Sequence, residues 1–326
     1  MMAQLAQTPV RPVWRRTWVT ASVLLLGLAC VPLLVDHTYL YYLATLALIQ
    51  SLGAMGLHLL LRTGQINLGH AAFVGVGAYA SSLLMVQYEV PWLLAMACGV
   101  GASVVLALVV GPIVLRLQGV YFILITFTFG EIVRLVFVEA KKVTGGSDGL
   151  YGIPPPLPQL MDPRAYYVFA LVFAVLVFLL CRRILDSDVG KAMNSISLSE
   201  GLAETSGVNT LKVRIFVFAV ACAIAALQGS VEAHFIRYIS PLTFGFGESV
   251  KFLTMNIIGG VGSIWGAVIG AFFLTALPEL LRGFPEYQWV FYGLILVLTM
   301  HFAPGGVMGT AEKFADWRAR RKGAKP

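Results

Sequence analysis

Residues 186–214, DSDVGKAMNSISLSEGLAETSGVNTLKVR, form a polar island between long apolar segments. The chain of 326 residues is 58% hydrophobic and only 12% charged, which leaves too little polar surface to cover a water-soluble globule. The composition therefore indicates an integral membrane protein in which the island is a loop outside the bilayer. A membrane protein seldom keeps such a loop without a partner, so we expect a docking element.

Apolar runs of about 20 residues, the length that a helix needs to cross a bilayer, recur on both sides of the island. They predict an all-α integral membrane protein of about ten transmembrane helices. We expect these helices at 17–35, 39–61, 66–87, 91–115, 119–138, 165–184, 213–235, 248–262, 264–282 and 287–303. The segment 248–262 ends in Gly259-Gly260-Val261-Gly262, which favours a re-entrant or broken helix over a full span.

Basic residues predict the orientation, because Lys and Arg in short loops concentrate on the cytoplasmic side. With the N-terminus inside, most of the 23 Lys and Arg residues fall in cytoplasmic segments. We therefore expect a transmembrane domain at 17–303, cytoplasmic tails at 1–16 and 304–326, an external loop at about 139–164 and an internal loop at 186–214. The basic C-terminal tail fits lipid headgroups and not nucleic acid.

Catalytic and cofactor motifs do not emerge from the sequence. Gly190-Lys191 is followed by Ala192 and lacks the upstream glycine of a phosphate-binding loop, so we expect no ATP hydrolysis by this chain and no cofactor in it. The run of small residues at 75–80 lies in an apolar segment and favours close helix packing over a dinucleotide site. His58 and His70 stand on separate segments, which favours packing over proton relay or metal binding.

Ionisable residues inside apolar segments are costly and predict either neutralising pairs or functional sites. Glu131 with Arg134, and Glu248 with Lys251, are three residues apart and can neutralise each other on one helix face. Glu232 has no such neighbour and is the candidate for an ion-coupled site. Its place near a helix end favours a side chain that reaches the membrane interface instead.

Both predicted loops carry local patterns that suggest partners. In the internal loop, Ser197–Gly207 reads as a short amphipathic helix whose lack of basic charge favours a groove on a soluble partner over the bilayer surface. The external loop holds a glycine-rich turn at 144–149 and a stiff Pro154-Pro155-Pro156 run, which indicate either a contact surface for an external partner or a solvated turn. Similar stretches at 64–69 and 240–245 suggest an internal inverted repeat.

Four blocks of sequence resemble one known family. They are 62–79 (RTGQINLGHAAFVGVGAY), 117–134 (LQGVYFILITFTFGEIVR), 144–150 (TGGSDGL) and 258–266 (IGGVGSIWG). Over about 40–304 the chain resembles the LivM-type permeases of branched-chain amino acid ABC importers. The resemblance implies a type II arrangement of helices in a bacterial inner membrane, with both termini cytoplasmic. It also implies four partners: a LivH-type second permease, two cytoplasmic ATPases that bind ATP and Mg, and a periplasmic substrate-binding protein.

The resemblance also implies roles for individual residues. Coupling to an ATPase is implied for Gly190, Glu200, Ala203, Glu204 and Gly207; the translocation path or helix packing for Gly64, Gln65, Asn67, Gly69, His70, Gly130, Glu131, Gly259, Gly260 and Gly262; and contact with the binding protein for Thr144, Gly145, Gly146 and Asp148. Ser197 and Leu198 depart from the Arg-Glu pair that is usual there, and Asn67 stands where Ser is common.

Alternative functions stay open at this point. The sequence does not choose between branched-chain amino acids and other amino acids, amides, urea or aromatic acids as the solute. It also leaves open whether the two permeases of the complex are identical. A secondary carrier would need a self-contained ion site, for which Glu232 argues, and a membrane enzyme would need a catalytic constellation.

Overall fold

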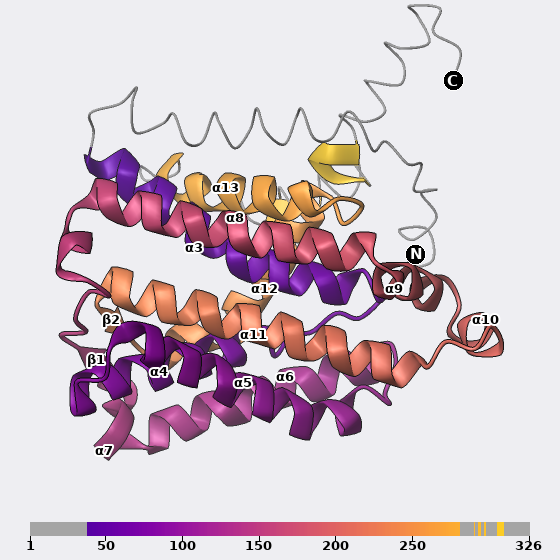
Figure 1. The fold of residues 1–326 in the computed structure, drawn as a ribbon, viewed down its shortest axis with the longest axis horizontal. Coiled ribbons are helices and arrows are strands. Elements are labelled where there is room, and N and C mark those ends of the chain that lie inside the picture. Colours follow the sequence, from indigo (N-terminus) through magenta and orange to yellow (C-terminus); the bar gives the residue numbers. More distant parts are fainter. Residues whose placement is uncertain (1–37, 281–289, 291–292, 295–296, 298–304, 310–326) are drawn as a thin grey trace, which may run out of the picture.

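The computed structural model describes residues 38–280, 290, 293–294, 297 and 305–309 (Figure 1). Its helices are α3 (Thr38–Leu61), α4 (His70–Tyr88), α5 (Trp92–Val114), α6 (Val120–Glu139), α7 (Lys141–Thr144), α8 (Pro163–Asp186), α9 (Asp188–Leu198), α10 (Glu200–Thr205), α11 (Thr210–Ile236), α12 (Phe246–Gly259) and α13 (Ile264–Leu280). Three 3-10 turns, η1 (Gly146–Asp148), η2 (Pro158–Met161) and η3 (Pro241–Phe244), and two short strands, β1 (Leu150–Tyr151) and β2 (Tyr238–Ile239), complete these segments.

Six helices of the described part are long and apolar enough to cross a membrane: α3, α4, α5, α6, α8 and α11. Each overlaps one of the predicted spans, so the prediction of an all-α membrane protein is confirmed. The pair α12 and α13 makes a seventh candidate if it counts as one bent span. The predicted helix 17–35 lies outside the described residues, and 287–303 lies almost wholly outside them.

The predicted segment 248–262 is a short helix that ends in a sharp turn, as its glycines indicated. At a rise of about 1.5 Å per residue, the 14 residues of α12 reach about 21 Å, less than the roughly 30 Å of a bilayer core. Gly260 then takes φ +106°, a conformation open mainly to glycine, and α13 leaves at 116° to α12. A Cβ on Gly259 would lie 1.7 Å from the carbonyl oxygen of Gly266, so these two glycines let the arms of the bend meet.

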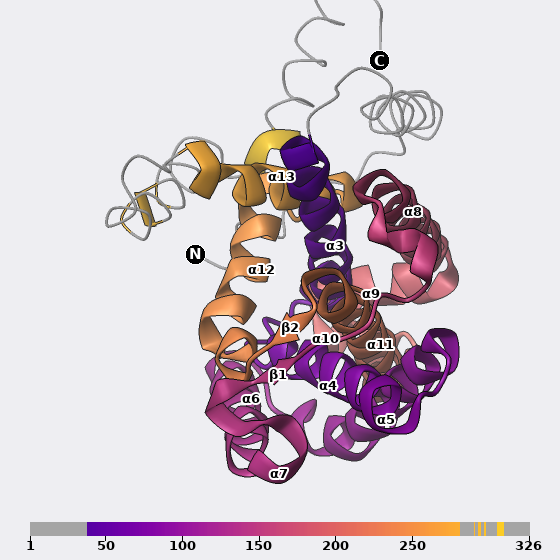
Figure 2. The ribbon, with the colours of Figure 1, turned by 90° about the vertical axis from the view of Figure 1, so that its left-hand side faces the viewer.

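α11 lies at the centre of the bundle, with α3 on one side and α4 and α5 on the other (Figures 1 and 2). Small residues make this possible, because a Cβ on Gly77 of α4 would lie 2.1 Å from the carbonyl oxygen of Ala226 of α11. The packing role expected for the small residues at 75–80 is therefore confirmed. In α3, 83% of the most apolar stretch is buried, against 17% in α6, so α6 presents most of its surface to lipid or to another protein.

The ionisable residues of the apolar segments form contacts within the protein. Arg134 pairs with Glu131 at 2.7 Å and Lys251 with Glu248 at 2.9 Å, as their spacing predicted. The prediction that Glu232 reaches the membrane interface is wrong. Its side chain is 8% exposed and accepts hydrogen bonds from Gln50 Nε2 at 3.0 Å and Gln228 Nε2 at 2.6 Å, because α3 covers the face of α11 from which Glu232 projects.

The two buried histidines of α3 and α4 take part in packing, as expected. His58 Nδ1 lies 3.1 Å from Asn256 Oδ1 and thereby joins α3 to α12. His70 Nε2 donates to the carbonyl oxygen of Gly53 at 3.1 Å, and its ring lies edge-on to Phe252. Among the described residues, no group of three or more His, Cys, Asp and Glu side chains is arranged to hold a metal ion.

The polar segments gather at opposite ends of the bundle. α9 and α10 lie at one end, here called the α10 end, and α7, β1 and β2 lie at the other, here called the β end (Figure 1). β1 and β2 pair antiparallel, with Leu150 opposite Ile239 and Tyr151 opposite Tyr238. The two loops that the sequence marked out as contact surfaces are therefore separated by the length of the long helices.

Candidate functional site

The polar segment between α8 and α11 folds as two helices, so the predicted single helix over Ser197–Gly207 is wrong. Ser199 is extended, with φ −163° and ψ 114°, and its hydroxyl accepts from the backbone N–H of Leu202 at 3.5 Å. A serine hydroxyl that caps a new helix competes with continuation of the old one. The chain therefore ends α9 at Leu198 and starts α10 at Glu200.

α9 is the element that sequence reasoning missed. Val189, Met193 and Ile196 follow the i, i+4, i+7 spacing of an amphipathic helix, and the last two are buried beneath it. Asp188 in its first turn is favourable for the helix dipole. The Lys191 ammonium, 2.7 Å away, lowers the pKa of this exposed Asp188 carboxyl.

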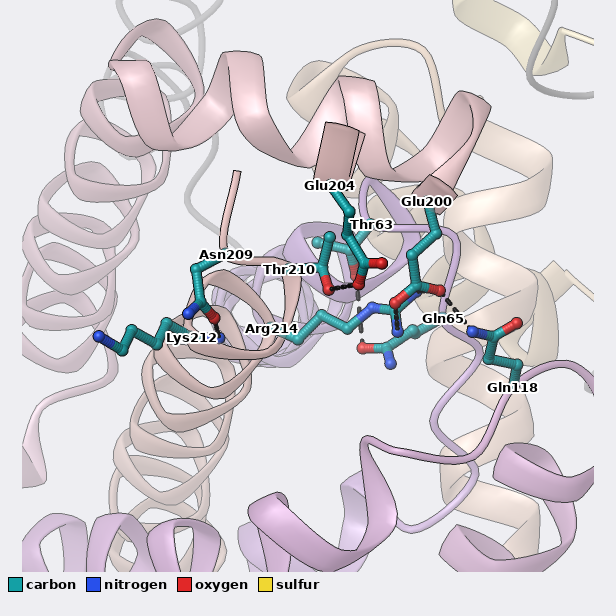
Figure 3. A network of polar contacts seen from close by, with 9 residues as sticks. All are labelled: Thr63, Gln65, Gln118, Glu200, Glu204, Asn209, Thr210, Lys212 and Arg214. Atoms are coloured by element: carbon teal, nitrogen blue, oxygen red, sulfur yellow. Dashed lines mark hydrogen bonds and ion pairs between the residues drawn. The ribbon is translucent and has the colours of Figure 1, made fainter. Parts of the chain in front are cut away.

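An ion pair fixes α10 to the start of α11. Arg214 donates through Nη1 and Nη2 to the two carboxylate oxygens of Glu200, at 2.6 and 2.8 Å. Gln118, from the loop between α5 and α6, donates its amide to the same carboxylate (Figure 3). The Arg214 side chain is only 8% exposed, and such bidentate, charge-assisted hydrogen bonds fix direction as well as distance. Three separate segments thus meet at Glu200.

A second contact closes the same loop on itself. Thr210, the first residue of α11, donates its hydroxyl to Glu204 at 2.9 Å (Figure 3). Gly207 takes φ +84° between the two helices, and Asn209 caps α11 by accepting from the backbone N–H of Lys212 at 3.0 Å. The ending of α10 at a glycine turn was predicted from the sequence.

The predicted coupling residues therefore shape this loop more than they project from it. Glu200 and Glu204 have partners inside the chain, and Ala203 is buried. Gly190 is required by close packing, because a Cβ there would lie 2.0 Å from the carbonyl oxygen of Leu185. Contact of these residues with an ATPase stays a prediction.

Two leucines project from the loop instead. Leu198, at the end of α9, is 68% exposed, and Leu202, in α10, is 70% exposed. Beneath α9, Arg62 donates to Asn194 Oδ1 at 2.6 Å and to the carbonyl oxygen of Gly262, in the turn between α12 and α13, at 3.4 Å. The loop thus presents an apolar tip on a base that is bonded to the transmembrane helices.

Several of the residues predicted for the path or for packing make close contacts between helices. A Cβ on Gly69 would lie 2.4 Å from the carbonyl oxygen of Thr126, and one on Gly130 would lie 3.1 Å from Gly69 Cα, so these glycines let α4 approach α6. Asn67 Oδ1 accepts from the N–H of Gly69 at 2.9 Å, and Glu131 Oε1 accepts from the N–H of Phe246 at 3.2 Å. These contacts support packing, while a role in lining a path stays a prediction.

The remaining path candidates lie in turns at the α10 end. Gly64 takes φ +78° and packs near Ser197 of α9, and Gln65 is buried next to Thr63. Gly262 is exposed and accepts from Arg62 through its carbonyl oxygen. Arg62, in the loop after α3, thus bonds both to Asn194 of α9 and to the turn after α12.

At the β end, the motif 144–149 forms a compact turn. Thr144 is buried and donates its hydroxyl to the carbonyl oxygens of Phe137 at 2.6 Å and Ala140 at 2.9 Å. Gly145 and Gly146 have φ of +77° and +60°, and Asp148 is exposed at the tip. Of the residues predicted to contact a binding protein, Thr144 and Gly146 are buried, and Asp148 is accessible for that role.

Comparison with known proteins agrees with this architecture. Residues 39–300 match the family model described as branched-chain amino acid transport system / permease component. The chain is 28% identical to the high-affinity branched-chain amino acid transport system permease protein LivM of Escherichia coli, over 82% of this chain and 69% of that protein. It is 24% identical to LivH of the same organism, over 76% of this chain and 87% of the relative.

An import permease named for a different solute is similar as well. The chain is 25% identical to the ribose import permease protein RbsC of Haemophilus influenzae, over 76% of this chain and 79% of the relative. No solved structure matches the chain. Since the family model covers most of the sequence, from the first described helix to the last apolar segment, the chain belongs to the family of permease components of branched-chain amino acid transport systems.

Proposed function

We propose that this chain is a permease subunit of an ATP-driven ABC importer and forms part of the translocation path for branched-chain amino acids. The LivM and LivH relatives carry that substrate class in their names. Energy comes from two ATPase subunits outside this chain, and a LivH-type permease is its partner in the membrane. A periplasmic binding protein delivers the solute and provides most of the selectivity.

In this proposal the α10 end is cytoplasmic and the β end is periplasmic. The excess of Lys and Arg in the segments at the α10 end and in both chain termini supports this orientation in a bacterial inner membrane. The ATPases then meet α9 and α10, and the binding protein meets the turn around Asp148 and the exposed Tyr151 next to it.

The single observation that carries the proposal is the pair of exposed leucines at the α10 end, Leu198 and Leu202, on a loop that internal contacts hold to the helix bundle. Leu198 and Leu202 are exposed to water on helices outside the membrane, which is unfavourable for apolar side chains. Burial of both in a cleft on another protein would lower the free energy of the system. The ion pair of Glu200 with Arg214 keeps the base of this tip fixed to α11, so that a force on the tip reaches the bundle. ATP binding closes the ATPase pair, displaces the tip and rocks the helices around the path.

The docking step is tested with Leu202→Asp, because the 70% exposure of this side chain makes its replacement harmless to packing. The variant is co-expressed with the second permease and the ATPases, and the complex is isolated in detergent through a tag on this chain. We expect the ATPases to be lost from Leu202→Asp and retained by the matched control Leu202→Met. Full retention of the ATPases by Leu202→Asp would contradict docking at this tip.

The solute is tested by binding of labelled leucine, valine and ribose to the purified binding protein of the same system. We expect leucine and valine to bind and ribose not to bind. The similarity to a ribose import permease makes a sugar the second candidate. Binding of ribose alone would replace the proposed substrate class and leave the ATP-driven mechanism in place.

A further inference from the structure

One helix joins the two ends at which partners are proposed to bind. α11 runs through 27 residues without a proline, about 40 Å at a rise of about 1.5 Å per residue. It begins next to α10 and leads, through Arg237 alone, into β2. α11 also lies at the centre of the bundle and runs from the α10 end to the β end (Figure 1).

At the α10 end, the attachment of α11 is ionic and directional. Arg214 lies one turn into α11 and holds both carboxylate oxygens of Glu200, the first residue of α10. Nearby, Thr210 of α11 donates its hydroxyl to the carboxylate of Glu204, in the same short helix α10, at 2.9 Å (Figure 3). A partly buried ion pair adds little net stability, but its geometry is specific, and loss of one partner leaves the other charge without compensation. Arg214 therefore fixes α10 relative to α11.

At the β end, the outer loop is bonded to the last turn of α11 and to β2. His234 Nδ1 donates to the carbonyl oxygen of Pro154 at 2.8 Å, and the Tyr238 hydroxyl donates to the carbonyl oxygen of Asp148 at 3.2 Å. β2 follows at once and pairs with β1. The turn proposed to meet the binding protein is therefore hydrogen-bonded to the strand that directly follows α11.

Between its ends, α11 is closely packed and cannot easily deform. A Cβ on Gly229 would lie 1.9 Å from the carbonyl oxygen of Val74 in α4. Tyr166 of α8 donates its hydroxyl to the carbonyl oxygen of Val231 at 2.8 Å. A regular helix held along its length responds as a unit, because close-packed interiors have low compressibility.

We propose that α11 transmits the state of one face of the importer to the other, with Arg214 as the positioning residue that holds the ATPase-facing helix α10 to it. This rests on the proposed function, since it requires a binding protein at the β end and ATPases at the α10 end. Docking of the loaded binding protein moves the β1–β2 ribbon and α11, and Arg214 passes this movement to α10.

α8 is the competing route, because it also runs between the two ends and continues into α9 after Ser187. Its first residue, Pro163, comes 12 residues after the end of β1 along the chain, whereas β2 follows α11 after a single residue. Asp186 at the end of α8 pairs with Arg182 at 3.5 Å. Asp186→Asn therefore removes an ion pair within the last turn of α8, next to its junction with α9, and is the comparison for the competing route.

The test measures ATP hydrolysis by the complete reconstituted importer, without and with its substrate-loaded binding protein. The ratio of the two rates reports the coupling between faces. For Arg214→Met we expect this ratio to fall by at least about fivefold, the lower end of typical coupling between sites. The double variant Glu200→Arg with Arg214→Glu restores the pair in reverse and should recover most of the ratio. Lys212→Met, an exposed cation two residues away, and Asp186→Asn should leave it unchanged.

A ratio unchanged in Arg214→Met would overturn the proposal, and so would a loss in Asp186→Asn as large as that in Arg214→Met. If Arg214→Met does not fold, Tyr238→Phe provides the second test, because it removes one hydroxyl at the opposite end of α11. We expect it to lower the ratio too, and an unchanged ratio would contradict transmission through α11. Failure of the proposed function is distinguishable, because it appears in the wild-type protein as leucine uptake by this chain alone without ATP.

Discussion

The contact between α4 and α11 predicts that Gly229→Ala destabilises the protein. The added Cβ would lie 1.9 Å from the carbonyl oxygen of Val74, 2.8 Å from its carbonyl carbon and 3.1 Å from the backbone nitrogen of Ala78. Backbone atoms cannot rotate away as a side chain can. To bring the closest contact to 3.0 Å, the helices must separate by at least 1.1 Å (3.0 − 1.9), and the close contact at Gly77 would be strained in turn.

Overpacking of this kind costs about 1–3 kcal/mol, and one kcal/mol shifts the melting temperature of a domain of this size by roughly 2–4 °C. We therefore expect Gly229→Ala to melt about 2–12 °C below the wild type, followed by tryptophan fluorescence in detergent. Two of the tryptophans, Trp92 and Trp265, are buried in the described core and report its loss.

Gly101→Ala provides the control, because it makes the same substitution in the middle of α5, where a Cβ would meet nothing within 4 Å. Alanine is a better helix former than glycine, so this variant should melt at or slightly above the wild-type temperature. A Gly229→Ala variant as stable as Gly101→Ala would refute the close packing of α11 against α4.

Two further changes test other parts of the structure. Glu232→Leu leaves the buried amides of Gln50 and Gln228 without their acceptor, at about 1–3 kcal/mol each, so the melting temperature of this variant should fall. Glu232→Gln keeps a carbonyl acceptor, so its melting temperature should fall less. Equal melting temperatures of the two variants would contradict the buried cluster. Ser199→Ala removes the cap of α10 and should cost about 1 kcal/mol, which is measured as faster hydrogen exchange at Leu202 and Ala203. Ser195→Ala, within α9, is the control. Unchanged exchange in Ser199→Ala would show that the hydroxyl does not start α10.

The transmembrane part of the fold could be predicted from the sequence because its signals are local. A run such as 39–61 is apolar over the whole length of a span, and the helix α3 ends at the same residue, Leu61. The glycines at 259–262 likewise indicated the break after α12, since a backbone at φ +106° favours glycine whatever surrounds it.

The features that were missed depend on partners far away in the sequence. Glu232 was expected at the interface because it lies near a helix end, and nothing local shows that Gln50, 182 residues away, covers it. Glu200 was interpreted as a contact residue, but Arg214 is 14 residues away, across a helix break that no periodicity spans. The other helix break, between α9 and α10, follows from the hydroxyl of Ser199, and whether this hydroxyl caps a helix or is exposed depends on tertiary structure.

The most direct test of the proposed function is uptake of labelled leucine into proteoliposomes that contain this chain, the second permease and the ATPases, with the binding protein outside. The proposed function predicts uptake that requires both ATP inside the vesicles and the binding protein, and no uptake by this chain alone. Leucine uptake by this chain alone without ATP would contradict an ATP-driven importer and would direct attention to Glu232 as an ion-coupled site.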